Sequence, residues 1–414
     1  TYGTLNWIDS PYIYLYVKPN QNIGIKFENS LYHTMHIFAN PPKPAVPAGA
    51  LYFGPGVHDV GLSYTLSPSQ NVVYLDGGAW VKGTLNIINA KNVKIIGPGV
   101  LSGENWPWES ISTIIAKDWN EANKYFLIHA HDNGPAITDT PIEIKGTTLV
   151  ASPAVNINLN NLASLDIDNV HVLSPWTYNT DAFDVQGNNV NITNSFSFVN
   201  DNTLIAEFSS RGEYNVTDCV INGRTINVGY GYFTSLTSAA NLNNIDIIYP
   251  EFASLLPEDP TWHTAVFEAK IDGSSSNIVV ENQYYNNIVI DGDVDQLFEF
   301  VIDDTVWGAP GPAQGNMRNI NFKNIELLGK QRFKSEIKGK DNNNQIHDIT
   351  FTNLKIDGTY VDADNYQDFF DIGKYTYNIS FIERMPRTDL NNDGVSDFSD
   401  LVILAAHWLK ESTP

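Results

Sequence analysis

The chain is poor in the features that mark disulfide-linked and membrane-embedded proteins. It has a single cysteine in 414 residues, Cys219, so no disulfide can form within the chain, and we expect this thiol to lie in the core. No apolar run approaches the roughly 18 residues of a membrane span, and no secretory signal is visible. The sequence therefore predicts a soluble protein that, if exported, is already processed.

Positive charge is also scarce. Lys and Arg number 24 against 47 Asp and Glu, which gives a formal net charge of −23. Nucleic acid and anionic membranes repel so acidic a protein, so neither is an expected partner, and a polyanionic substrate would need a local basic pocket. No apolar pattern of helical period persists before the C-terminus, which indicates a mainly β protein.

Short apolar runs recur at a nearly constant spacing. Runs at Ile142, Leu165, Val190 and Tyr214 start 23, 25 and 24 residues apart, and later runs start at Leu242, Asn277, Arg318 and His347. The runs are too short for helices, and the Asn residues beside them suit tight bends and side-chain ladders. The pattern predicts an all-β fold, a parallel β-helix, with a β-sandwich as the alternative.

Changes in the residue pattern divide the chain into three predicted parts. Residues 1–48 alternate apolar and polar side chains up to a Pro-rich stretch, and we interpret them as a small β-sandwich-like module. Residues 49–385 carry the repeat. Residues 386–414 form a short loop-helix segment.

The C-terminal segment has the spacing of a calcium-binding loop. Oxygen ligands fall at loop positions 1, 3, 5, 7, 9 and 12, which are Asp389, Asn391, Asp393, the Val395 carbonyl, Asp397 and Asp400. A loop followed by one helix resembles half of a dockerin. A full dockerin has two such repeats, so docking to a cohesin is not expected. We predict a structural calcium ion here that takes no part in chemistry.

Two aspartates, twenty residues apart, mark the candidate active site. Asp181 and Asp201 each follow an apolar strand-like run, so neighbouring turns of a coil would bring them side by side. A carboxyl group and a carboxylate so placed are the pair that glycoside hydrolysis needs. Asp184, three residues after Asp181, would point to another part of the coil unless the chain bends there, and it is the alternative candidate for a catalytic carboxylate. Asn179 is a candidate to orient the acids.

A family resemblance rests on the same stretch. NTDAFDVQGNNVNITNSFSFVNDNTLIAEF resembles the catalytic region of glycoside hydrolase family 49, the dextranase and isopullulanase family, whose pattern is Thr-Asp and, about a coil later, Val-Asn-Asp-Asp. MHIFANPPKPAVP and LYFGPGVHDVG resemble that family's junction between a β-sandwich and a right-handed β-helix. The likeness covers most of residues 30–385 and touches the polygalacturonase family, whose Gly-His-Gly and Arg-Ile-Lys motifs are missing here.

The resemblance implies roles for individual residues. Asp201 matches the general acid and Asp181 an aspartate that activates water, with inversion at the anomeric carbon. Asn202 replaces the second Asp of the family's pair, so one of three carboxylates is lost. That loss weakens the like-charge repulsion that keeps an acid protonated, and it makes Asn202 a candidate substrate contact.

Further candidates for substrate binding are aromatic or charged residues near the acids. Aromatic rings stack on sugars, and Glu207 follows Asp201 closely enough to line a cleft. For an isolated aromatic residue, packing in the core is the simpler interpretation. The aromatic candidates are Trp106, Trp108, Trp176 and Tyr178.

Together these observations predict a secreted, monomeric, endo-acting hydrolase of a neutral α-glucan, dextran or pullulan, that needs no cofactor for catalysis. Three alternatives stay open. One is a hydrolase of a pectic or sulfated galactan chain. A polysaccharide lyase is disfavoured because residues 181–202 contain no Lys or Arg. The last is a carbohydrate-binding solenoid in which Asn202 records lost activity.

Overall fold

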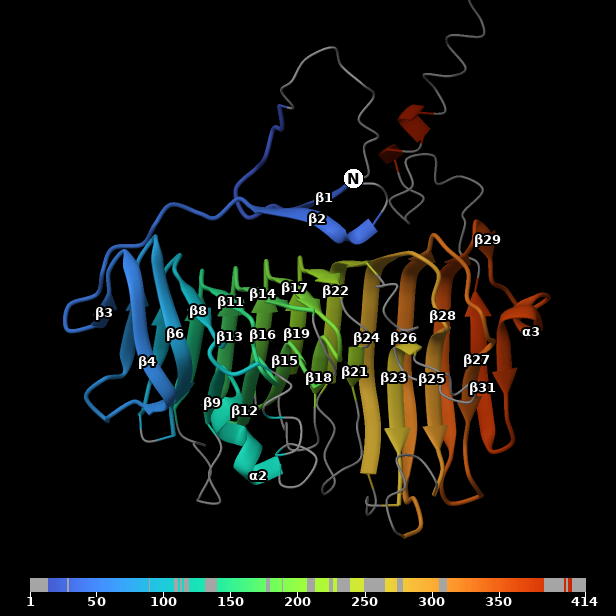
Figure 1. Cartoon of the computed structure of the whole chain (residues 1–414). Coiled ribbons are helices and arrows are strands. Elements are labelled where there is room, and N and C mark those ends of the chain that lie inside the picture. The colour runs from blue at the N-terminus through green and yellow to red at the C-terminus, as the bar shows by residue number, and fades with distance from the viewer. Residues whose placement is uncertain are drawn as a thin grey trace, which may run out of the picture.

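The computed structural model describes most of the chain. The residues it describes are 14–27, 30–88, 90–107, 111, 114, 119–130, 140–175, 179–187, 189–206, 213–222, 226–228, 239–248, 265–273, 278–304, 311–382, 398–399 and 401–403. They form a stack of coils with a hairpin along one long side (Figure 1). The calcium-loop residues lie outside them.

Three parallel sheets run along the stack. The first sheet contains, in order, β3 (Leu51–Phe53), β5 (Val72–Leu75), β7 (Lys94–Ile96), β10 (Pro141–Lys145), β13 (Ser164–Asp168), β16 (Val190–Thr193), β19 (Glu213–Thr217), β22 (Ala239–Ile248), β24 (Ile278–Asp291), β26 (Gly315–Leu327), β28 (Ile346–Ile356) and β31 (Thr376–Ile382). The second contains β4 (Gly56–Thr65), β6 (Ala79–Asn86), β8 (Val100–Ser102), β11 (Thr148–Val150), β14 (His171–Ser174), β17 (Phe196–Val199) and β20 (Val220–Asn222) before it joins β22.

The third sheet begins on the last residues of β6. It continues through β9 (Ile128–Ala130), β12 (Ile157–Leu162), β15 (Phe183–Gly187), β18 (Leu204–Ala206), β21 (Ile226–Val228), β23 (Ala265–Ile271), β25 (Gln296–Ile302), β27 (Ser335–Lys338) and β30 (Phe370–Ile372). The short elements that remain are β1 (Asn22–Phe27), β2 (Ser30–Phe38), α2 (Trp119–Ala122), η1 (Asn123–Tyr125), β29 (Thr359–Tyr360) and α3 (Tyr366–Phe369).

The predicted parallel β-helix is therefore confirmed, and the β-sandwich alternative is wrong, because the strands of all three sheets pair in parallel. The register also confirms the repeat. Ile142 pairs with Leu165, Leu165 with Val190, and Val190 with Tyr214, so the spacing seen in the sequence is the length of one coil. The side chains at the first three positions are at most 1% exposed, because each coil places the same strand position in the interior.

Aromatic side chains stack along the interior of the later coils. Tyr285, Phe322, Phe351 and Phe381 occupy one register row, and consecutive ring centroids lie 4.4, 5.2 and 4.9 Å apart with interplanar angles of 13° or less. Tyr366 of α3 stacks on Phe381 at 5.0 Å and ends the column. The rise of about 4.8 Å per coil brings the rings into this contact.

The corners of the coils carry Asn residues in the left-handed backbone region. Asn287, Asn324 and Asn353 have φ of about 54–55° and form a ladder in which each side-chain amide donates to the side chain of the coil before, at 2.9 Å. Asn reaches this backbone region at little cost. The expected Asn ladders are thus present.

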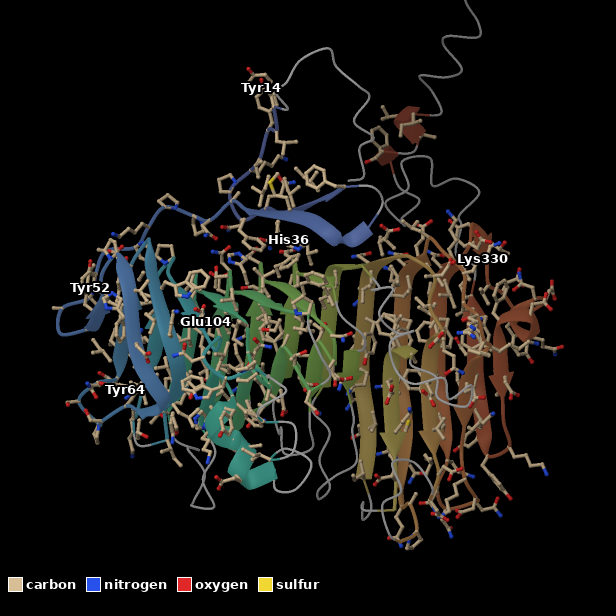
Figure 2. All side chains as sticks on the ribbon, viewed as in Figure 1. Tyr14, His36, Tyr52, Tyr64, Glu104 and Lys330 are labelled. Carbon is tan, nitrogen blue, oxygen red and sulfur yellow. The ribbon has the colours of Figure 1, made fainter. Side chains whose placement is uncertain are left out.

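The N-terminal hairpin packs on the second sheet. In the described part of residues 1–48, β1 and β2 pair antiparallel, and they cover the coil rather than a second sheet of their own. The Phe38 ring stacks on His171 with centroids 4.0 Å apart, and the His36 ring lies 4.9 Å from Phe196. Figure 2 shows His36 between the hairpin and the coils. These contacts join the hairpin to the middle of the stack.

Burial leaves His171 poorly able to accept a proton. The side chain is fully buried, and burial lowers its pKa to about 4 from 6.5.

In the described residues no helix has the length and apolar character needed to cross a bilayer.

The lowered pKa predicts an acid-sensitive hairpin contact. Stability that His171 contributes above pH 6.5 is lost as the pH falls towards 4, because the unfolded chain then binds a proton that the folded protein excludes. Phe in this position keeps the stacking and cannot titrate. We expect His171→Phe to reduce the fall in unfolding free energy between pH 7 and 4.5 by about 2 kcal/mol, measured by denaturant titration. An equal fall in both proteins would contradict the burial argument.

Candidate active site

The third sheet presents polar side chains on its outer face. In β15, Phe183 and Val185 face the core and are 4% and 0% exposed, while Asp184 between them faces outward. The register sets Asp184 beside Asn158 of β12 and Ile205 of β18. Although it faces outward, Asp184 is only 8% exposed.

The two aspartates singled out in the sequence lie on neighbouring coils, as their spacing predicts. Asp181 comes just before β15, and Asp201 and Asn202 come just before β18. The backbone N–H of Ala182 donates to the carbonyl of Asn202 at 3.0 Å, which locks the two coils in register. The Asn202 side chain then donates from Nδ2 to Oδ1 of Asp181 at 3.0 Å.

Backbone amides hold the carboxylate of Asp201. The N–H of Asn179 donates to Oδ2 at 2.6 Å and that of Asn202 to Oδ1 at 2.9 Å. Asn179 has φ of 59°, the left-handed conformation that Asn tolerates. The contact of Asn179 with Asp201 is therefore made by its backbone N–H rather than its side-chain amide, and the two backbone amides together orient the Asp201 carboxylate.

Asp181 retains a proton far more strongly than an ordinary aspartate. Burial raises its pKa well above the usual value, because the residue is only 4% exposed, and the negative charges of Asp201 and Asp184 raise it further. The amide of Asn202 acts in the opposite direction. Three carboxyl groups therefore share one electrostatic site, although position 202 carries no acid.

Asp184 belongs to this site, contrary to the expectation that it points to another part of the coil. Asp181 precedes the strand, so strand alternation does not separate the two side chains. The Asn158 amide donates from Nδ2 to Oδ2 of Asp184, and Asn158 is 4% exposed.

Sequence reasoning missed two asparagines, Asn156 just before β12 and Asn158 within it. Asn156 is fully buried and donates from Nδ2 to the carbonyls of Thr180 and Asp181, both at 3.1 Å, which fixes the loop that carries Asp181. Asn158 contacts Asp184 directly. The segment VNINL shows the alternation of a strand, but only the 26-residue offset to β15 reveals what lies beside it.

Most of the other predicted contacts cannot be placed. Trp108, Trp176, Tyr178 and Glu207 lie outside the described residues. Trp106 is half-buried and packs against a small apolar cluster that includes Phe126 and Val155, away from the core of the coil. All five substrate-binding assignments stay predictions.

Comparison with known proteins supports the fold and the resemblance. No family model matches the chain. The chain is similar to isopullulanase. This protein of Aspergillus niger is 25% identical over 299 residues, which cover 68% of the present chain and 50% of the relative, so the chain spans about half the length of the relative it matches.

Two solved structures share the architecture. Dex49A from Penicillium minioluteum has a TM-score of 0.62 at 18% identity, covering 84% of this chain and 67% of that one. The Family 28 exopolygalacturonase of Yersinia enterocolitica has a TM-score of 0.54 at 12% identity, covering 82% and 74%. At these identities the likeness shows the parallel β-helix alone.

The raised pKa of Asp181 predicts that its removal stabilises the protein. Above the unfolded-state value of 3.8, the folded protein keeps a proton that the unfolded chain releases, so this group makes stability fall as pH rises. We expect Asp181→Asn to increase the unfolding free energy, by more at pH 8 than at pH 4, in denaturant titrations. Asp166→Asn, at an exposed position of the first sheet, is the control. A gain that does not grow with pH would sink this assignment.

Proposed function

We propose that this chain is a glycoside hydrolase that cleaves a neutral α-glucan such as dextran or pullulan. The meeting of Asp181, Asp184 and Asp201 on neighbouring coils, where burial raises the pKa of Asp181, carries the proposal. The similarity to isopullulanase supports the reaction class, and the fold shared with Dex49A supports the architecture.

Glycosidic hydrolysis needs one carboxyl group that protonates the leaving oxygen and one carboxylate that activates water. Asp201 is half-buried and more accessible than Asp181, so we assign it the proton transfer that the resemblance implies. Asp181 is the base that the resemblance implies, and it acts in its ionised form, in which the raised pKa makes it a stronger proton acceptor. Asp184 supplies the third carboxyl group that Asn202 does not.

One observation favours the reverse assignment. Burial stabilises the protonated form of Asp181, whereas Asp201 is half-buried and its carboxylate accepts two backbone N–H groups. In that case Asp181 is the proton donor and Asp201 the base. The two assignments differ in how each variant responds to a better leaving group, which makes them separable by experiment.

The charges farther along the third sheet favour a neutral polymer. Glu268, Glu299, Glu336 and Asp371 share one register row beyond Asp184 towards the C-terminus. Lys270 lies between two of them, 3.1 Å from Glu268 and 3.0 Å from Glu299, and burial raises the pKa of Glu299 to about 7 despite this lysine. Lys338 likewise lies 2.9 Å from Glu336 and 3.1 Å from Asp371, so two lysines face these four acids. The acidic excess that is left disfavours a uronate chain and supports a glucan over a pectic substrate.

The proposal has parts that rest on the sequence alone. They are export from the cell, endo action with inversion, a monomeric state, and a structural calcium ion bound by residues 389–400. The fold of the exopolygalacturonase keeps a hydrolase of another polysaccharide as the second candidate, and a non-catalytic carbohydrate-binding solenoid as the third.

Incubation with dextran, pullulan and polygalacturonate tests the proposal. We expect reducing ends from dextran or pullulan and none from polygalacturonate. Asp201→Asn is expected to lower kcat on the order of 10²–10⁴-fold, the contribution of a general acid or base, with an unchanged circular dichroism spectrum. Asp166→Asn again serves as the control. No release from any polymer, with retention on one, would instead identify a binding protein.

An aryl glycoside of the preferred sugar assigns the proton donor. Its leaving group departs without protonation, so the variant that lacks the donor keeps more activity on it than on the polymer. We expect this selective retention in Asp201→Asn. The same behaviour in Asp181→Asn would establish the reverse assignment.

A further inference from the structure

One buried polar atom of Asn158 has no hydrogen-bond partner within the part of the chain that the structure describes. Oδ1 of Asn158 is buried and, among the described residues, makes no hydrogen bond, while Nδ2 of the same amide donates to Asp184. A buried acceptor costs on the order of 1–3 kcal/mol unless a bound molecule supplies a donor to it.

The bond to Asp184 fixes which way the amide points. Asn158 can donate only from its nitrogen, and the carboxylate of Asp184 can only accept when it is ionised, so the oxygen must face away from that carboxylate. Donation to the carboxylate also polarises the amide, which increases the negative charge on Oδ1 and makes it a better acceptor. The site therefore offers a fixed, polarised acceptor next to the carboxyl groups.

The position of Asn158 along the stack suits a sugar. Its strand β12 is the coil before β15, so Asn158 stands one rung from Asp184, about 4.8 Å along the axis of the stack, on the N-terminal side. It shares the outer face of the third sheet with Asp184. Asn158 and Asp181 are both 4% exposed and Asp184 is 8% exposed, so the amide and the two acids are covered to a similar extent.

We propose that Asn158 is a substrate-binding residue whose Oδ1 accepts a hydrogen bond from a hydroxyl of the sugar beside the cleaved bond, while its Nδ2 holds Asp184 in place. This inference rests on the proposed function and deepens it. It assigns the coil before Asp184 to recognition of a neutral, hydroxyl-bearing unit, because an amide oxygen accepts from a hydroxyl and repels a carboxylate. The acidic row of β23 and β25 lies on the other side of Asp184.

Binding measured without turnover tests the subsite. In an Asp201→Asn background, isothermal titration with isomaltohexaose and maltohexaose is expected to show a Kd about ten-fold higher when Asn158→Ala is added, which corresponds to about 1.4 kcal/mol. Asn191→Ala is the matched control, because Asn191 is also an outward strand residue, bonded to Asn215 on the first sheet. We expect this control to leave Kd unchanged.

Two further readouts separate recognition from a structural role. In the otherwise native chain, Asn158→Ala is expected to raise KM for the polymer as well as lower kcat, with a thermal midpoint close to that of Asn191→Ala. A lowered midpoint with an unchanged Kd would show that Asn158 only supports the fold and would overturn the inference. An unchanged Kd with an unchanged midpoint would overturn it equally.

The same experiments distinguish failure of the subsite from failure of the function. If the native chain cleaves a glucan but Asn158→Ala binds as tightly as the control, the subsite is wrong and the hydrolase stands. If the native chain cleaves none of the polymers but the hexasaccharides bind, and Asn158→Ala weakens that binding, the subsite stands on a binding protein. If neither hexasaccharide binds, the inference is overturned together with the function.

Discussion

The register between successive coils of the third sheet is the constraint on which the candidate site depends. Asp181, Asp184 and Asp201 are separated in the chain by as many as twenty residues, and the hydrogen bond from Ala182 to the carbonyl of Asn202 makes them neighbours. A slip of one residue would turn outward side chains towards the core, because strand side chains alternate between faces. The apolar interior, with Phe183 and Val185 packed inside, is what prevents that slip.

Within that frame, the site is an arrangement of charge that the fold does not favour. Three carboxyl groups lie close together with little access to water, and the protein lowers the cost by retaining a proton on Asp181 and by surrounding Asp201 and Asp184 with amide donors. Asn202 fits this balance. An aspartate there would add a fourth carboxyl group, whereas the amide donates to Asp181.

The coil could be predicted from the sequence because the apolar runs recur at the length of one coil. The spacing from Ile142 to Leu165 is the coil length, and the twenty residues between Asp181 and Asp201 correctly indicated neighbouring turns. The N-terminal region is antiparallel, as its alternation predicts, but its packing on His171 was beyond reach because that contact joins residues more than a hundred positions apart.

The fine structure of the site was less predictable. The side chains at positions 181 and 184 would point in opposite directions if both lay in one strand. The strand begins only at Phe183, so this rule does not apply to Asp181. Asn158 gave no signal, because its neighbour depends on the exact length of the loop between β12 and β15. Alternation in the sequence predicts whether a side chain faces the core or the solvent. The length of the loop between two strands determines which residue of the next coil lies beside it.

The cap formed by Tyr366 on the last aromatic ring has a consequence for association between molecules. A stack of parallel coils ends in a strand with unpaired backbone groups and an apolar row open to the next layer, which invites another chain to continue the stack into a fibre. By covering the ring of Phe381, α3 removes the apolar half of that template. The ring that ends the described aromatic column is therefore not open to the apolar row of a second molecule.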